Sequence, residues 1–312
     1  MGRIHKYLGT SRTDITGYKN VSELADVDCN NKGCGALMLD DPAINPFAYD
    51  WNAVFVRYCD GMAFSGNKTE PDVDPKTGQQ LWYRGRENLR GTFETLADSY
   101  SLGLATEVVL NGASAGGHAV YLHADYMADM VSKANVAAGR PRAAIVAMPD
   151  SGFWPDDPRK RFSLMFRNWF NVLGNDTNAL PLHCKWVTSN ATKCLFPEYF
   201  AAEIETRLMP LQSIYDPDQH RAKASDPQAH GDWLVSTMNN TIFSRERVPR
   251  NGAFVYSCSR HCGGELLKVD GYTAPEALGL LWKGERTLFL DHQPYPCKTC
   301  CNDAPYPPVL QK

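Results

Sequence analysis

A serine lies between small residues in the segment TEVVLNGASAGG, residues 106–117. The β-branched start of this segment predicts a strand, and residues 116–135 predict a helix. A G-x-S-x-G motif between a strand and a helix is typical of a nucleophile elbow, a turn so sharp that small residues are needed around the exposed serine. We therefore interpret Ser114 as a nucleophile and the N–H of Ala115, at the helix N-terminus, as the first oxyanion donor. The alternative is an ordinary turn rich in glycine and alanine.

A serine nucleophile needs a histidine as its general base, and hydrolases with this element order place that histidine after the serine in the chain. The sequence contains eight histidines, of which His261 is the strongest candidate. It lies in the segment SCSRHC, directly after a predicted strand at 252–259. The alternative is a loop histidine between two structural cysteines.

The acid that orients the histidine has two candidates. Asp216 ends a predicted strand at 210–216, and Asp150 ends a predicted strand at 142–150. Both lie at the carboxyl end of a strand, where such acids are found in α/β folds. An aspartate at this place is also common as a turn or helix-capping residue, so the residues alone do not separate the two.

Strands and helices alternate along the chain and must position these residues. Predicted strands lie at 51–60, 106–112, 142–150, 210–216 and 252–259, and predicted helices at 84–103, 116–135, 161–174 and 275–284. This alternation predicts an α/β fold with a mostly parallel sheet, helices on both faces and a ligand site at the carboxyl ends of the strands. The sequence has no internal repeat and no clear linker, so we expect residues 1–312 to form one domain.

The composition excludes several classes of function. Hydrophobic residues make up 43% of the 312 residues, enough for a large core. The net charge of -3 gives no basic face for nucleic acid. No run of 18 apolar residues exists, so we expect no membrane span, and we expect a monomer.

Cysteines and glycosylation sequons point to an oxidising compartment. The sequence has 10 cysteines in local clusters. Five sequons accompany them, at Asn20, Asn67, Asn175, Asn190 and Asn239. We therefore expect a secreted protein, although the first residues, MGRIHKYLGTSRTD, lack the apolar stretch of a signal peptide.

Several motifs together resemble one family. They are VRYCDGMAFSGN around Asp60, NGASAGG around Ser114, PDSGFW after Asp150, the Tyr215-Asp216 pair and SCSRHC around His261. In this order they resemble the plant pectin acetylesterases, whose wider family includes the Notum-type carboxylesterases that remove a fatty acyl group from a signalling protein. NPFAYDWNAVFVRYCDG, CLFPEYF and YPCKTC strengthen the resemblance, which runs from about residue 5 to residue 305.

The resemblance implies an α/β-hydrolase fold and ester hydrolysis by a Ser-Asp-His triad. Carried over by motif, the triad is Ser114, Asp216 and His261. The resemblance thus favours Asp216 as the acid and leaves the segment Asp150-Ser151-Gly152 a structural or pocket-forming role. It implies no metal and no organic cofactor. The implied function is a secreted hydrolase that removes acetyl groups from pectin-like cell-wall polysaccharide. The alternatives are a Notum-like deacylase of a lipidated protein and an inactive polysaccharide-binding homologue.

The sequence departs from the family at its start. Members carry a glycine-rich LEGGGWC-type segment that supplies the second oxyanion N–H, but residues 5–14 here already resemble the stretch on the C-terminal side of that segment. We expect an N-terminally truncated chain with an exposed sheet edge. We further expect the 312 residues to be weakly active or inactive until an upstream segment is restored. A genuinely shortened, inactive homologue is the alternative.

The cysteines around His261 have two interpretations. Cys258 and Cys262 could bind zinc together with cysteines 297, 300 and 301. The sequons favour disulfides, so we predict that Cys258 and Cys262 each bridge to that C-terminal group. We also predict a local disulfide between Cys184 and Cys194.

Overall fold

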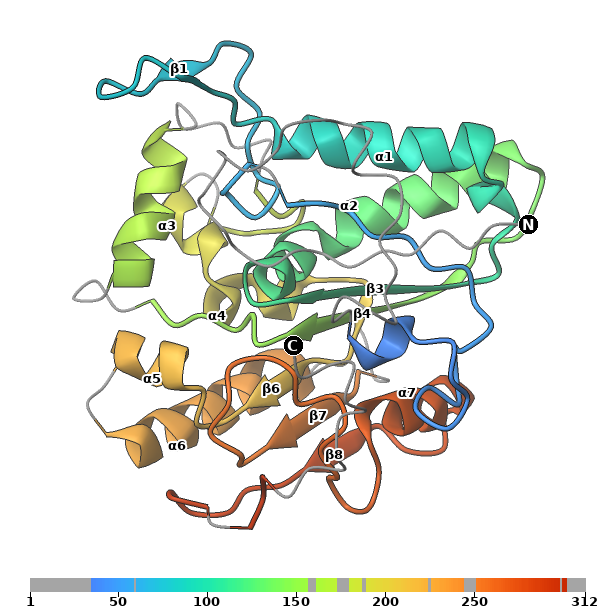
Figure 1. The fold of residues 1–312 in the computed structure, drawn as a ribbon, viewed down its shortest axis with the longest axis vertical. Helices are drawn as coiled ribbons and strands as arrows, with labels where there is room; N and C mark the ends of the chain where they lie inside the picture. The colour runs from blue at the N-terminus through green and yellow to red at the C-terminus, as the bar shows by residue number, and fades with distance from the viewer. Residues whose placement is uncertain are drawn as a thin grey trace.

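A parallel sheet forms the centre of the computed structural model (Figure 1), which describes residues 35–58, 60–156, 161–172, 180–186, 189–223, 226–243, 251–297 and 299–301. The strand order is β3-β4-β6-β7-β8, and β5 also pairs with β4. The strands are β3 (Glu107–Ala113), β4 (Ala144–Asp150), β5 (Arg207–Leu208), β6 (Leu211–Ser213), β7 (Ala253–Tyr256) and β8 (Leu288–Leu290). Each of these pairings is parallel, which confirms the predicted α/β class.

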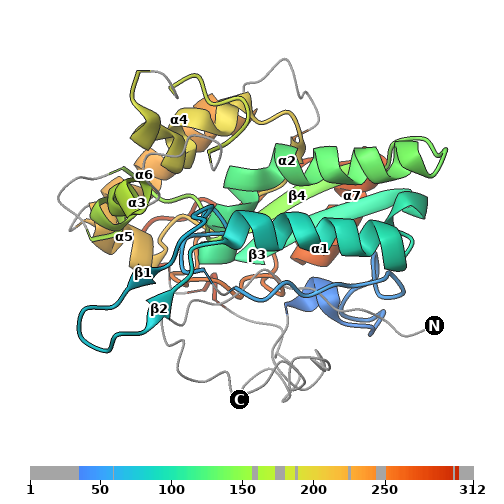
Figure 2. The same ribbon diagram turned by 90° about the horizontal axis from the view of Figure 1, so that it is seen from above.

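Seven α-helices surround the sheet in the described part of the chain. They are α1 (Gly85–Ser99), α2 (Ala115–Ala137), α3 (Arg161–Val172), α4 (Pro197–Phe200), α5 (Pro217–Lys223), α6 (Pro227–Met238) and α7 (Ala274–Lys283). Helices α3, α5 and α6 stand on the side where β3 and β4 end (Figure 1). A short antiparallel hairpin of β1 (Asp72–Val73) and β2 (Gln80–Leu81) projects from the same side (Figure 2).

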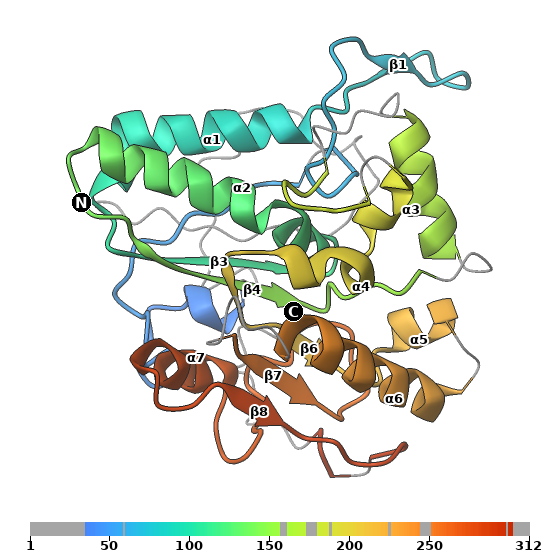
Figure 3. The same ribbon diagram turned by 180° about the vertical axis from the view of Figure 1, so that it is seen from behind.

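Strands β4 and β7 are buried on both faces because neighbouring side chains point to opposite cores. In β4, Ala147 packs in the core built with α1 and α2, whereas Val146 and Met148 pack in the core built with α7. In β7, Val255 and Phe254 divide in the same way. Figure 3 shows α2, α4 and α6 across the first of these faces. The two-sided core keeps the strand ends rigid, and these ends carry the predicted site residues.

Helix boundaries follow local signals. Helix α7 begins with a capping box between Thr273 and Glu276 and ends at Gly284, which has a left-handed φ of 74°. Helix α6 begins at Asp226, whose side chain accepts a hydrogen bond from Gln228 N. No helix in the described ranges is long and apolar enough to span a membrane.

The predicted strand at 51–60 is wrong. Residues 52–58 form no strand, and Cys59 lies outside the described residues. The side chains from Ala53 to Tyr58 are only partly buried, and none of the strands described pairs with this segment. Aromatic and β-branched composition therefore does not make a strand by itself.

Three disulfides test the cysteine predictions. The Cys184–Cys194 bridge is confirmed. Cys258 bridges to Cys301 as predicted, but the prediction for Cys262 is wrong, because its thiol is free. The third bridge joins cysteines 297 and 300 to each other, so every predicted partner of Cys262 is already bonded. These pairings also exclude the zinc interpretation; cysteines 29, 34 and 59 lie outside the described residues.

Candidate active site

Ser114 occupies a strained turn between β3 and α2. Its φ is 56° and its ψ is -116°, a conformation that costs a non-glycine residue free energy. Its N–H donates a hydrogen bond to the Asp150 carbonyl at 2.9 Å, which fixes the turn against the end of β4. The next residue, Ala115, is the first of α2, so its N–H belongs to the positive end of a 23-residue helix.

Two glycines outside the G-x-S-x-G motif, Gly117 and Gly152, have no room for a side chain beside this turn. A Cβ added to Gly117 would lie 2.2 Å from the Asp150 carbonyl oxygen. A Cβ added to Gly152 would lie 2.3 Å from the Gly117 carbonyl carbon. The start of α2 and the end of β4 can therefore approach this closely only because both positions lack a side chain. The motif alone did not identify either residue.

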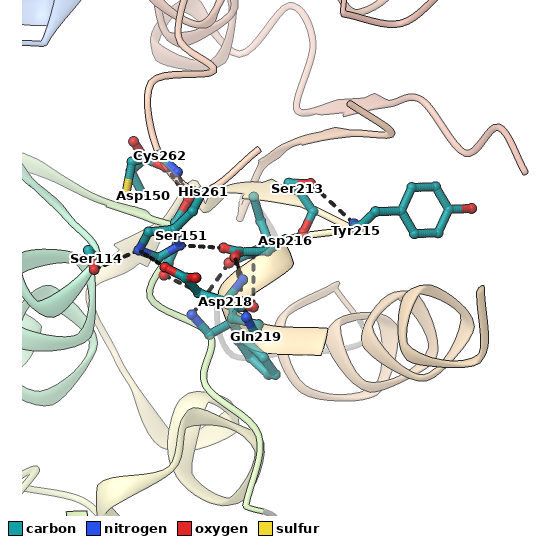
Figure 4. A network of polar contacts seen from close by, with 12 residues as sticks. Ser114, Asp150, Ser151, Ser213, Tyr215, Asp216, Asp218, Gln219, His261 and Cys262 are labelled. Carbon is teal, nitrogen blue, oxygen red and sulfur yellow. Dashed lines mark hydrogen bonds and ion pairs between the residues drawn. The ribbon is translucent and has the colours of Figure 1, made fainter. Parts of the chain in front are cut away.

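Ser114, His261 and Asp216 form one hydrogen-bonded chain (Figure 4). His261 Nε2 lies 2.7 Å from Ser114 Oγ, and His261 Nδ1 lies 2.7 Å from Asp216 Oδ2. The Asp216 side chain is fully buried, whereas 19% of the His261 side chain is exposed. The structure thus brings together the three residues that the sequence singled out, at distances suited to proton transfer.

Asp216 is held by the helix that follows it. Its Oδ1 accepts hydrogen bonds from Asp218 N at 2.9 Å and Gln219 N at 3.3 Å, at the start of α5. Its Oδ2 remains for the imidazole. Burial raises the pKa of Asp216 above its usual value, and the hydrogen bond and charge of His261 offset part of that rise.

His261 lies in the loop after β7, and side chains of neighbouring loops fix this loop. Cys262 N donates to Ser151 Oγ at 2.9 Å, and Ser259 Oγ donates to the Tyr215 carbonyl at 3.0 Å. The Trp154 ring lies 5.6 Å from the imidazole, centre to centre. Burial lowers the pKa of His261, but the hydrogen bond and charge of Asp216 outweigh it, so the net pKa lies above its usual value.

Asp150 lies behind this arrangement. Its side chain is fully buried, and its Oδ1 accepts a hydrogen bond from Ser151 Oγ at 2.8 Å. Burial, followed by the charge of Glu265, raises the pKa of Asp150 to about 8. Asp150 therefore supports the turn that holds the His261 loop, and the place beside His261 Nδ1 belongs to Asp216.

Two further residues contact this arrangement: Ser151, which the family resemblance places in a structural or pocket-forming segment, and Asp218, which sequence reasoning missed. Ser151 links Asp150 to the His261 loop, and its carbonyl accepts a hydrogen bond from Gln219 Nε2. Asp218 Oδ2 lies 3.7 Å from His261 Nε2. The signal that could have found Asp218 is its place two residues after the candidate acid, in the first turn of a helix. Within the described ranges, no group of three or more His, Cys, Asp or Glu side chains could hold a metal ion.

Comparison with known proteins identifies the family. The family model described as Pectinacetylesterase matches residues 28–248. The chain belongs to the pectinacetylesterase family. Pectin acetylesterase 5 of Arabidopsis thaliana is 27% identical over 301 residues, which cover 85% of this chain and 67% of the relative. Palmitoleoyl-protein carboxylesterase NOTUM of Drosophila melanogaster is 29% identical over 266 residues, which cover 78% of this chain and 37% of the relative.

A solved structure confirms the fold of this family member. The Wnt deacylase Notum from Drosophila superimposes with a TM-score of 0.64 at 22% sequence identity, covering 81% of this chain and 75% of that chain. The α/β-hydrolase fold and the resemblance stated from the motifs are thereby confirmed. Family membership assigns the protein to the carboxylic-ester hydrolases. The chain spans about two thirds of the length of its Arabidopsis relatives.

Proposed function

We propose that this protein removes acetyl groups from a pectin-like polysaccharide by nucleophilic catalysis, with Ser114 as nucleophile, His261 as base and Asp216 as orienting acid. The observation that carries the proposal is the continuous hydrogen-bonded chain of these three side chains, with 2.7 Å at each of its two contacts. It lies at the carboxyl edge of a parallel sheet, where ligands of α/β folds bind.

The first half of the reaction acylates the serine. Ser114 Oγ attacks the acetyl carbonyl carbon while His261 Nε2 takes the hydroxyl proton. Asp216 stabilises the resulting imidazolium, and the Ala115 N–H donates to the developing oxyanion. The bond to the sugar oxygen then breaks, and the sugar leaves with the proton from His261 Nε2. An acetylated Ser114 remains.

The second half regenerates the serine. A water molecule attacks the acetyl carbonyl carbon and gives a proton to His261 Nε2, acetate leaves, and Ser114 recovers its proton. Every proton in this cycle moves through one imidazole nitrogen. The proposed cycle therefore uses neither a metal ion nor an organic cofactor.

The names of relatives support the acetyl substrate. The pectin acetylesterases 5 and 4 of Arabidopsis thaliana each match over 85% of this chain. We also propose that the protein is secreted to the cell wall, because its described residues contain three disulfides and because sequon residues Asn190 and Asn239 are exposed. We further propose that residues 1–312 form one domain and act as a monomer.

The deciding experiment compares two esters and one variant. Acetate release from acetylated pectin is measured beside hydrolysis of a palmitoleoylated serine peptide, for the wild type and for Ser114→Ala. We expect acetate release to require Ser114, and to be weak for residues 1–312 and stronger once a glycine-rich upstream segment is restored. Cleavage of only the palmitoleoyl ester would favour the Notum-type function. Binding of pectin without hydrolysis, and without labelling by a fluorophosphonate probe, would favour a non-catalytic role.

A further inference from the structure

A second carboxylate lies beside the candidate base. Asp218, in the first turn of α5, places Oδ2 3.7 Å from His261 Nε2, and 43% of its side chain is exposed. Asp216 occupies the other side of the imidazole, at Nδ1, and is fully buried (Figure 4). The two carboxylates therefore have different surroundings, although only one residue separates them in the sequence.

The side of the imidazole that Asp218 flanks is the side where the substrate reacts. His261 Nε2 lies 2.7 Å from Ser114 Oγ and 3.7 Å from Asp218 Oδ2. The nucleophile and the Asp218 carboxylate therefore lie close to the same imidazole nitrogen. In the proposed reaction the same nitrogen gives its proton to the leaving sugar oxygen. The proposed reaction therefore brings the alcohol portion of the ester to the side of the imidazole that Asp218 flanks.

The other charged groups near His261 have partners of their own. Asp216 is paired with the imidazole. Burial raises the pKa of Asp150 to about 8, which favours its neutral form. The guanidinium of Arg260, in the same loop as His261, donates to the Gly263 carbonyl at 2.9 Å. A substrate entering beside His261 Nε2 therefore meets an exposed carboxylate.

We propose that Asp218 is a specificity-determining residue that favours esters whose alcohol portion carries no negative charge. The preferred substrate is then an acetate on a neutral or esterified sugar, and an acetate on a sugar with a free carboxylate is disfavoured. This inference rests on the proposed ester hydrolysis. Repulsion between two like charges on neighbouring groups of an exposed site changes a rate by roughly 3- to 10-fold.

The test compares kcat/KM for two acetylated methyl glycosides, one with a free uronate carboxylate and one with its methyl ester. The proteins are the wild type, Asp218→Asn, Asp218→Lys and the control Asp129→Asn. Asp129 is an exposed acid paired with Lys133 on α2, about 20 Å along the helix from Ser114 at 1.5 Å per residue.

We expect the wild type to favour the neutral ester, and Asp218→Asn to raise the uronate-to-neutral ratio roughly 3- to 10-fold. Asp218→Lys should raise it further, and Asp129→Asn should leave it unchanged. Added salt should reduce the preference of the wild type but not that of Asp218→Asn. An unchanged ratio in both Asp218 variants, or an equal change in the control, would overturn the inference while ester hydrolysis stands. All four proteins carry a restored glycine-rich upstream segment. A wild type in this form that hydrolyses neither ester nor a small aryl acetate would overturn the proposed function as well.

Discussion

An aspartate lies at or just beyond the end of each of the strands β4 and β6, but Asp216 contacts the imidazole of His261 and Asp150 contacts Ser151. The two strands are neighbours and pair at Asp150 and Leu211. Asp150 is the last residue of its strand, and its carboxyl is buried against Ser151. Asp216 lies three residues beyond its strand, caps α5 and reaches His261. The length of loop between the strand end and the acid, and the helix after that loop, decide which carboxyl meets the imidazole.

The largest expected effect separates these two acids. Asp216→Asn should lower kcat for a small aryl acetate by about 10⁴, because the wrong imidazole tautomer is then favoured. Asp150→Asn should lower it far less, because Asp150 contacts the imidazole only through Ser151 and the backbone of the next loop. Steady-state kinetics with both purified variants measures the difference. A greater loss in Asp150→Asn would reverse the assignment of the acid.

The second prediction concerns the tight contact at the end of β4. Gly117→Ala should reduce the free energy of unfolding by about 1–3 kcal/mol, because its Cβ would meet the Asp150 carbonyl oxygen. Gly91→Ala in α1 is the matched control, since nothing lies within 4 Å of its Cβ, and it should be neutral or stabilising by up to about 1 kcal/mol. Urea denaturation compares the two. Equal effects would show that the contact does not limit position 117.

The third prediction uses the buried carboxyl of Asp150. Its pKa is about 8 in the folded protein against 3.8 for an ordinary aspartate, so its contribution to stability is full below about pH 4 and declines as the pH rises to about 8. Burial raises the pKa of Glu265 in the same direction. The variant Asp150→Asn lacks one of these two groups. As the pH rises from 4 to 8, its melting temperature should therefore fall less than that of the wild type. Parallel melting curves at all pH values would contradict the raised pKa.

The smallest effect is expected from the link between the two loops. Ser151→Ala removes the hydroxyl that accepts from Cys262 N and donates to Asp150, worth about 1 kcal/mol. We expect kcat to fall roughly 3- to 10-fold with KM unchanged, because the imidazole loses position while substrate contacts remain. Thr206→Val, which removes a hydroxyl bonded to Asp125 at the amino end of β5, is the control and should leave kcat unchanged. A loss confined to KM would contradict a positioning role.

The serine turn and the histidine loop could be predicted because their signals are local. A strand, a small-residue turn and a helix follow one another around Ser114, and His261 lies in the loop that follows β7. The choice between Asp150 and Asp216 depends on the path of the chain after each strand, which composition does not specify. The predicted strand at 51–60 and the predicted bridge from Cys262 failed for the same reason, since both need a partner distant in the sequence.

The bridge between Cys258 and Cys301 sets an order of assembly. Cys258 stands at the start of the loop that carries His261, and its partner follows 43 residues later. Closing a loop of that length stabilises the folded state by roughly 4 kcal/mol in the chain-entropy model. During synthesis, Ser114 and Asp216 leave the ribosome well before this bridge can close. The loop of the proposed base is therefore covalently anchored only after Cys301 has been synthesised, and we expect full activity to depend on the oxidation of Cys258 and Cys301.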